Sequence, residues 1–103
     1  MDAQLQKRIE DQIKGSKIML YMKGTPDMPQ CGFSAKTAAI LKSYGVAFNT
    51  FNIFDDEDIR QGLKEYSEWP TFPQLYVNGE LVGGCDIVTE LHENGELAAI
   101  LQK

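Results

Sequence analysis

Residues 17–34 decide the fold and read Lys-Ile-Met-Leu-Tyr-Met-Lys-Gly-Thr-Pro-Asp-Met-Pro-Gln-Cys-Gly-Phe-Ser. The first six, residues 17–22, form an apolar run without periodic polar breaks, which predicts a strand buried on both faces. Residues 24–30 hold two prolines and a glycine, which break both helices and strands, so a loop follows. Small and apolar residues return over 33–43 and predict a helix. Cys31 therefore stands between a loop and the start of a helix.

Further elements flank this stretch on both sides. Leu5, Ile9 and Ile13 recur every fourth residue among polar and charged residues, which indicates an amphipathic helix that ends at Gly15. After the helix over 33–43, the sequence predicts a strand over 46–53 and then a helix that begins near Asp55, Asp56 and Asp58 and buries Ile59, Leu63 and Tyr66. Two strands over 75–77 and 80–82 follow, joined by Asn78-Gly79. The chain continues with a helix capped by Asp86 that runs to Glu93, and with a last amphipathic turn that carries Leu97, Ile100 and Leu101.

This order of elements, α-β-α-β-α-β-β-α-α, predicts an α/β fold. The first two strands and the helix between them should form a right-handed parallel unit, and the closing hairpin should add antiparallel strands. We therefore expect a four-stranded mixed sheet flanked by helices on both faces. A chain of 103 residues is large enough for one hydrophobic core but not for two, so residues 1–103 are predicted to form a single domain.

Composition excludes several classes of function. The net charge of −5 argues against nucleic-acid binding, which needs clustered Lys and Arg to neutralise phosphates. No apolar run approaches the roughly 20 residues that span a bilayer, so no membrane association is expected. Residues 1–14 mix acidic and basic side chains, unlike a secretory signal or a transit peptide. Two cysteines without an export signal imply a reducing compartment, and we expect a cytoplasmic protein.

Cys31 is the candidate reactive thiol. Unpaired N–H groups and the dipole at a helix start stabilise a thiolate, which is both a nucleophile and a soft metal ligand. The alternative is an inert cysteine that only fills space. Ser34 stands where a dithiol redox motif has its second cysteine, so no disulfide can close there. Cys85 is the other thiol, and the sequence leaves open whether the two Cα atoms approach within the ~7 Å that a disulfide requires.

Ligand counting limits any metal centre. Cys31 and Cys85 are the only thiols, and His92 is the only imidazole. A structural zinc site takes about four Cys or His ligands, and an iron–sulfur cluster generally takes four thiolates. One chain cannot fill either site. Such a centre would need a second chain, a thiol from outside, or both.

Residues elsewhere in the chain are further candidates for binding a ligand at this thiol. Lys23 and Arg60 could be ordinary surface cations, but if they converge on Cys31 they would suit a small anionic thiol ligand. Phe72-Pro73 precedes a strand and invites a cis peptide bond, which would aim backbone groups at a ligand. Trp69 is expected to pack, with a role in lining the site as the second interpretation.

Three motifs resemble one known family. Residues 23–34 follow the pattern Lys-Gly-Thr-Pro-x-x-Pro-x-Cys-Gly-Phe-Ser, residues 69–77 read Trp-Pro-Thr-Phe-Pro-Gln-Leu-Tyr-Val, and residues 78–86 read Asn-Gly-Glu-Leu-Val-Gly-Gly-Cys-Asp. Together they resemble the CGFS-type monothiol glutaredoxins, and the resemblance extends over nearly the whole chain. It is closest to the single-domain class of that family.

The resemblance implies a thioredoxin fold with Pro73 in cis and glutathione bound without a covalent bond beside Cys31. By the same comparison, the residues that hold glutathione are Lys23 and Arg60 at its glycyl carboxylate, the backbone of Phe72 at its central residue, and Cys85 and Asp86 at its γ-glutamyl end.

Family members also bind a [2Fe–2S] cluster between two subunits, with one active-site cysteine from each subunit and two glutathione sulfurs. The resemblance therefore implies a homodimer bridged by the cluster, with Cys31 as the metal ligand, and a role in the assembly, storage or transfer of iron–sulfur clusters. Acceptor proteins and a BolA-type protein are the implied partners. The ligand count agrees, because two copies of Cys31 and two outside thiols make four.

Two other functions stay open. Cys31 could be the sole nucleophile of a glutathione-dependent thiol–disulfide reductase, with at most weak activity. Cys31 and Cys85 could instead form a regulatory disulfide. The sequence does not name the acceptor proteins.

Overall fold

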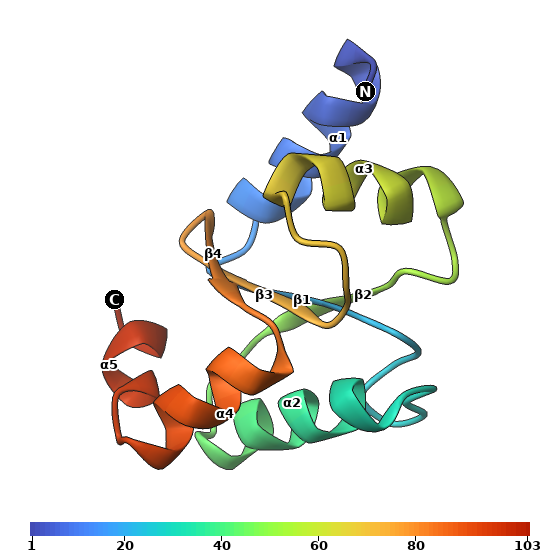
Figure 1. Ribbon diagram of the computed structural model, residues 1–103. Coiled ribbons are helices and arrows are strands. Elements are labelled where there is room, and N and C mark those ends of the chain that lie inside the picture. Colours follow the sequence, from blue (N-terminus) through green and yellow to red (C-terminus); the bar gives the residue numbers. More distant parts are fainter.

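The computed structural model describes residues 1–103 and has the predicted order of helices and strands (Figure 1). None of its helices has the length and apolar sequence needed to cross a membrane. The helices are α1 (Ala3–Lys14), α2 (Gly32–Ser43), α3 (Glu57–Ser67), α4 (Cys85–Glu93) and α5 (Leu97–Leu101). The strands are β1 (Ile18–Met22), β2 (Asn49–Asn52), β3 (Gln74–Val77) and β4 (Glu80–Gly83).

The four strands form one mixed sheet in the order β2-β1-β3-β4. β1 is parallel to β2, with Met22 opposite Asn52, and antiparallel to β3, with Leu20 opposite Leu75. β3 and β4 form the predicted antiparallel hairpin. The predicted four-stranded mixed sheet is therefore confirmed.

The sheet carries helices on both faces, as predicted. α1 and α3 cover one face, and α2 and α4 cover the other, with α5 beside α4 (Figure 1). Because side chains alternate along a strand, β1 contributes to two cores. Ile18, Leu20 and Met22 lie in the cluster under α2 and α4, whereas Met19 and Tyr21 lie in the cluster under α1 and α3. This double burial explains the apolar run without polar breaks.

The predicted second strand is shorter than expected. The predicted strand covers residues 46–53, but only Asn49–Asn52 pair with β1. β2 is an edge strand with β1 as its one neighbour, and its pairing begins at Asn49, opposite Met19. Val46 and Phe48 instead pack, partly buried, against the core under α2 and α4.

The predicted cap of the fourth helix is wrong. Gly84 is the N-cap residue of α4, and no side chain caps this helix. Asp86 lies in the first turn of α4, where a negative charge is favoured by the helix dipole. The helix starts earlier than predicted because the extended backbone of Gly84 leads directly into it. As a result, the N–H groups of the first turn of α4 have no side-chain acceptor.

Candidate functional site

The loop between β1 and α2 is closed by backbone hydrogen bonds. The N–H of Gln30 donates to the carbonyl of Lys23 at 2.9 Å, and the N–H of Gly24 donates to Oδ1 of Asn52 at 3.0 Å. Gly24 has a φ of +90°, and a Cβ there would lie 2.5 Å from the carbonyl oxygen of Met28. Only glycine fits this position. The loop therefore sets the direction in which the chain enters α2.

Cys31 is the N-cap residue of α2, and its thiol is free and partly exposed. The pKa of Cys31 is lowered, chiefly because the backbone N–H of Ser34 stabilises the thiolate. The backbone N–H of Phe33, the charge of Lys23 and the hydroxyl of Ser34 lower the pKa further, while burial acts in the opposite direction. The expected stabilisation of a thiolate at this helix start is present.

Ser34 is completely buried, although the sequence shows it only as the position without a second thiol. Its Oγ accepts a hydrogen bond from the backbone N–H of Lys23 at 3.0 Å. Because a hydroxyl both accepts and donates, the same group also interacts with the sulfur of Cys31. Ser34 thus joins the end of β1 to the start of α2 and supports the thiolate.

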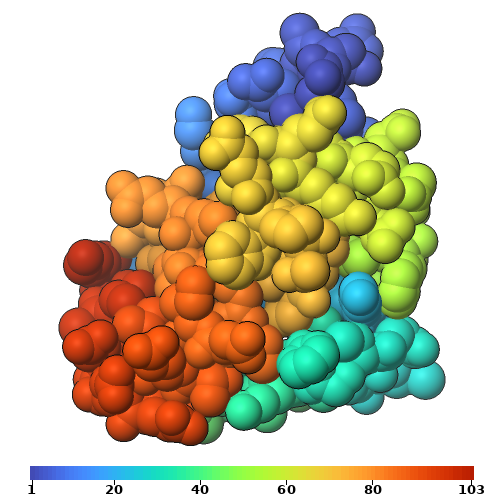
Figure 2. All heavy atoms as spheres, viewed as in Figure 1, coloured from blue at the N-terminus to red at the C-terminus, as the bar shows by residue number.

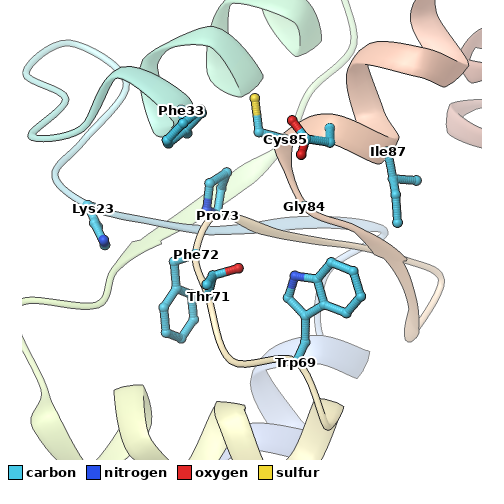
Figure 3. A pocket seen from close by; sticks show the side chains of 10 residues that line it. Lys23, Phe33, Trp69, Thr71, Phe72, Pro73, Gly84, Cys85 and Ile87 are labelled. Carbon is cyan, nitrogen blue, oxygen red and sulfur yellow. The ribbon is translucent and has the colours of Figure 1, made fainter.

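A cavity of about 360 Å³ opens beside this helix start. Figure 2 shows the surface where the start of α2 (teal), the segment before β3 (yellow to orange) and the start of α4 (orange) meet. In the close view, Lys23 and Phe33 lie on one side of the cavity and Trp69 and Ile87 on the other (Figure 3). The lining residues are Lys23, Phe33, Trp69, Thr71, Phe72, Pro73, Gly84, Cys85, Asp86 and Ile87.

Four of the predicted binding residues line this cavity together, namely Lys23, Phe72, Cys85 and Asp86. They come from three segments that lie far apart in the chain. Cys31 does not line the cavity itself, but Phe33, two residues later, is part of the lining. The charge of Lys23, another lining residue, helps to lower the pKa of Cys31.

Arg60 is not brought to the cavity wall in this structure. It lies on α3, and its Nη1 is 3.4 Å from a carboxylate oxygen of Glu57. This pairing within α3 is what an ordinary surface cation, the alternative interpretation of Arg60, would make. Its Nε, however, is buried and has no hydrogen-bond partner, so part of the guanidinium remains available.

The sequence only partly identifies the wall formed by residues 69–73. Trp69 lines the cavity as well as packing, and Thr71 does so without having been singled out. The Phe72–Pro73 bond is cis, as expected from the resemblance. Gly84 allows a close approach of the backbone, because a Cβ there would lie 3.2 Å from the carbonyl oxygen of Pro73. These residues meet only when the segment before β3 folds against α4.

The structure brings together no group of three or more His, Cys, Asp or Glu side chains that could hold a metal ion. The Nδ1 of His92 lies 2.6 Å from the hydroxyl oxygen of Tyr44, so this imidazole is engaged within the chain. Cys31 and Cys85 are both free thiols. A metal centre at Cys31 would therefore need ligands from outside this chain, as the ligand count indicates.

Comparison with known proteins gives a consistent result. Residues 18–82 match the family model described as glutaredoxin. The "Probable monothiol glutaredoxin 2" of Rickettsia typhi is 56% identical over 96 residues, which cover 93% of this chain and 86% of the relative. "Monothiol glutaredoxin-S11" of Oryza sativa subsp. japonica is also 56% identical over 96% of this chain, but the chain spans only 20% of that longer relative.

Comparison with solved structures leads to the same family. The solution structure of reduced poplar apo GrxS14 is 50% identical and superposes with a TM-score of 0.83, covering 95% of this chain and 90% of that one. The crystal structure of a buckwheat glutaredoxin–glutathione complex has a TM-score of 0.82 over 99% of this chain and 94% of that one, but at 21% identity it shows the fold alone. The predicted thioredoxin fold is confirmed, and the chain belongs to the glutaredoxin family, among its monothiol members.

Proposed function

We propose that this protein binds glutathione in the cavity and, with it, holds a [2Fe–2S] cluster shared between two copies of the chain. Its role would be the assembly, storage or transfer of such clusters. The observation that carries the proposal is the site of Cys31, where backbone N–H groups stabilise a thiolate. The position of a second thiol is taken by the buried hydroxyl of Ser34, so Cys31 stays available as a ligand.

The cavity suits glutathione in size and charge. Its volume of about 360 Å³ lies within the range of small-molecule sites, roughly 300–1,000 Å³. Glutathione carries two carboxylates and one ammonium group, and the cavity offers Lys23 and Asp86 as opposite charges. The uncapped start of α4, at Cys85, adds free backbone N–H groups for a carboxylate. A buckwheat glutaredoxin that shares this fold has been solved as a glutathione complex, which supports glutathione as the ligand.

Within this proposal, Lys23 and Arg60 hold the glycyl carboxylate, the backbone of Phe72 pairs with the central residue, and Cys85 and Asp86 hold the γ-glutamyl end. For Arg60, the support is its buried Nε without a partner, since a ligand carboxylate would satisfy that donor.

The donor set of the chain fits a shared cluster. Cys31 is a soft, thiolate-forming ligand, and the chain brings together no group of three or more metal-binding side chains. Two copies of Cys31 and two glutathione sulfurs would complete the four thiolates that a [2Fe–2S] cluster takes. The cluster is then the cargo that a homodimer carries, and acceptor proteins and a BolA-type protein are the proposed partners.

A second candidate function is glutathione-dependent reduction of mixed disulfides, and the lowered pKa of Cys31 favours it. The Cys31 thiolate would attack the glutathione sulfur of the substrate, form a disulfide with glutathione and release the substrate thiolate. A second glutathione thiolate would then attack this disulfide, which frees Cys31 and yields oxidised glutathione.

Anaerobic reconstitution with iron, sulfide and glutathione tests the main proposal. Wild-type protein should develop the visible absorption of a [2Fe–2S] cluster and elute as a dimer, whereas Cys31→Ser should stay colourless and monomeric. A parallel reaction without glutathione should also stay colourless. A colourless wild-type monomer, or colour that survives in Cys31→Ser, would refute the proposal. A turnover assay with a glutathione mixed disulfide measures the second candidate, which requires a substantial rate that is lost in Cys31→Ser.

A further inference from the structure

Two buried side-chain N–H groups have no hydrogen-bond partner, Nε of Arg60 and Nε1 of Trp69. A buried donor without a partner destabilises the folded state, and such groups are rare in native proteins unless water or a ligand satisfies them. Trp69 also lines the cavity. Its indole N–H is therefore a donor placed at the wall of a binding site.

The surrounding structure holds Trp69 in this place. The backbone N–H of Trp69 donates to Oγ of Ser67 at 3.1 Å, and its carbonyl accepts from Nε2 of Gln74 at 3.1 Å. Figure 3 shows the indole nitrogen on the edge of the ring that faces Thr71 and Gly84. These two bonds fix the backbone of Trp69 beside the cavity.

Gly84 lies close against this edge of the ring. A Cβ at position 84 would lie 3.2 Å from Nε1 of Trp69 and 3.2 Å from the carbonyl oxygen of Pro73. Because position 84 has no side chain, the start of α4 packs beside the indole edge that carries the unpartnered donor. A ligand oxygen bound at the start of α4 would therefore lie near this donor.

We infer that Nε1–H of Trp69 donates a hydrogen bond to an oxygen of the bound ligand at the α4 end of the cavity, which makes Trp69 a specificity-determining residue for the γ-glutamyl end of glutathione. The inference rests on the proposed glutathione binding. It assigns this end of the ligand because Trp69 stands with Ile87 and Gly84 on the side of the cavity away from Lys23 (Figure 3). Trp69 is only partly buried, in keeping with its place in the cavity lining.

The chain offers a direct measurement, because Trp69 is its only tryptophan and gives a single indole N–H resonance. Protein labelled with ¹⁵N should be titrated anaerobically with reduced glutathione. The indole resonance should shift, and its exchange with solvent should slow, together with shifts of the backbone amides of Phe72 and Cys85. With the dipeptides as probes, γ-glutamylcysteine should move the indole resonance and cysteinylglycine should not.

The variant Trp69→Phe keeps an aromatic ring but removes the donor. It should bind glutathione about two- to tenfold more weakly, as expected for one hydrogen bond. The loss of affinity should appear with γ-glutamylcysteine and be absent with cysteinylglycine, whereas a purely structural change would weaken the binding of both dipeptides. Phe54→Leu is the matched control, since Phe54 is 55% exposed and lies outside the cavity lining, and it should bind glutathione like wild type.

The outcomes separate this inference from the proposed function. If the amides of Phe72 and Cys85 shift while the indole resonance stays in place, glutathione binds and the role of Trp69 is refuted. An affinity of Trp69→Phe equal to that of wild type would refute it as well. If no resonance shifts with glutathione, the inference falls together with the proposed function. The indole measurement uses wild-type protein, so it decides the matter even if Trp69→Phe does not fold.

Discussion

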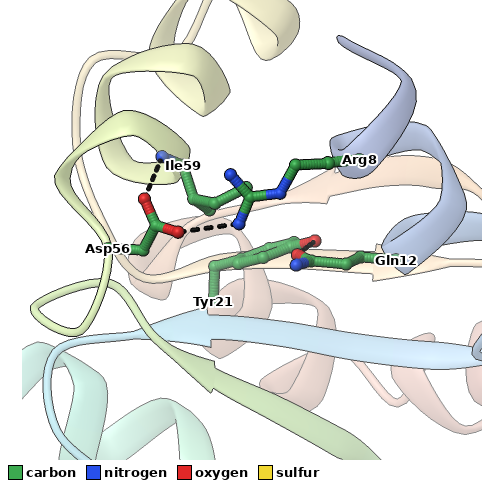
Figure 4. A network of polar contacts seen from close by, with 5 residues as sticks. All are labelled: Arg8, Gln12, Tyr21, Asp56 and Ile59. Atoms are coloured by element: carbon green, nitrogen blue, oxygen red, sulfur yellow. Dashed lines mark hydrogen bonds and ion pairs between the residues drawn. The ribbon is translucent and has the colours of Figure 1, made fainter. Parts of the chain in front are cut away.

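Two polar networks lie in different parts of the molecule, one between α1 and α3 and the other at the starts of α2 and α4. In the first, Arg8 bonds Asp56 at 2.7 Å, and Asp56 caps α3 by accepting the N–H of Ile59 at 3.1 Å (Figure 4). The hydroxyl of Tyr21 donates to Oε1 of Gln12 at 2.9 Å. Each of these groups has a partner within the chain.

The second network is incomplete. Cys31 has a free thiol, Nε1 of Trp69 has no partner, and the start of α4 has no side-chain cap. A protein that only needed to pack would be more stable with these groups satisfied or replaced by apolar ones. The contrast indicates that the α1–α3 network stabilises the fold, while the groups at the starts of α2 and α4 are those that the proposed glutathione would satisfy.

The first prediction tests the α1–α3 side and has the largest expected effect on stability. Leu63 of α3 is completely buried in the core that α1 and α3 share. Leu63→Ala should lower the free energy of unfolding by about 2–5 kcal/mol, because it removes packed atoms and leaves a cavity. Urea unfolding measures the change. Phe54→Ala, at a residue 55% exposed, should change it by less than about 0.5 kcal/mol. Equal effects of the two variants would contradict the prediction.

The second prediction concerns Ser34, which belongs to both the fold and the site. Ser34→Ala removes the acceptor of the Lys23 N–H and should destabilise the protein by about 1–3 kcal/mol. It should also raise the pKa of Cys31, because the hydroxyl helps to lower it. Urea unfolding and a thiolate absorbance titration measure the two effects. Ser43→Ala is the control, since Ser43 only donates to the carbonyl of Ile40 near the end of α2. An unchanged pKa of Cys31 would contradict the role assigned to the Ser34 hydroxyl.

The third prediction uses pH to weaken the α1–α3 side alone. Burial raises the pKa of Tyr76 to about 12 and also raises the pKa of Tyr21. A pKa that is higher in the folded state means that this stability is complete below the unfolded value of about 10 and is lost as pH rises through the folded value. The urea midpoint of the wild-type protein should therefore fall above pH ~10, and the midpoint of Tyr76→Phe should fall less steeply with pH. Parallel curves for the two proteins would rule out this contribution of Tyr76.

The smallest effect is expected at the surface pair Arg8–Asp56. The hydrogen bond from Arg8 is the main cause of the lowered pKa of Asp56. A depressed folded pKa gives stability that is present above about pH 4 and is lost as pH falls through the folded value. Arg8→Gln should therefore reduce the difference in urea midpoint between near-neutral and acidic pH. Lys7→Gln removes another exposed ion pair of α1, with Asp11, and should leave the acid dependence as in wild type. An acid dependence unaffected by Arg8→Gln would show that the pair does not contribute.

Local sequence was sufficient for much of the fold. The apolar run of β1 has no polar breaks because both of its faces are buried, so its place in the middle of the sheet could be predicted. The hairpin followed from Asn78-Gly79, since both residues adopt positive φ, 52° and 81°, which this pair tolerates. The reactive Cys31 and the missing second thiol at Ser34 were likewise readable, because helix-start chemistry depends on adjacent residues.

The cavity was decided by the tertiary structure. Lys23, Phe72 and Cys85 meet because β1 and β3 are neighbours in the sheet and the start of α4 folds over the segment before β3. The burial of Ser34 and the unpartnered N–H of Trp69 depend on the same packing. Residue types and spacing therefore determined the thiol and the elements around it. Which groups were satisfied and which were left free for a ligand depended on contacts between distant segments, and such contacts leave no local pattern.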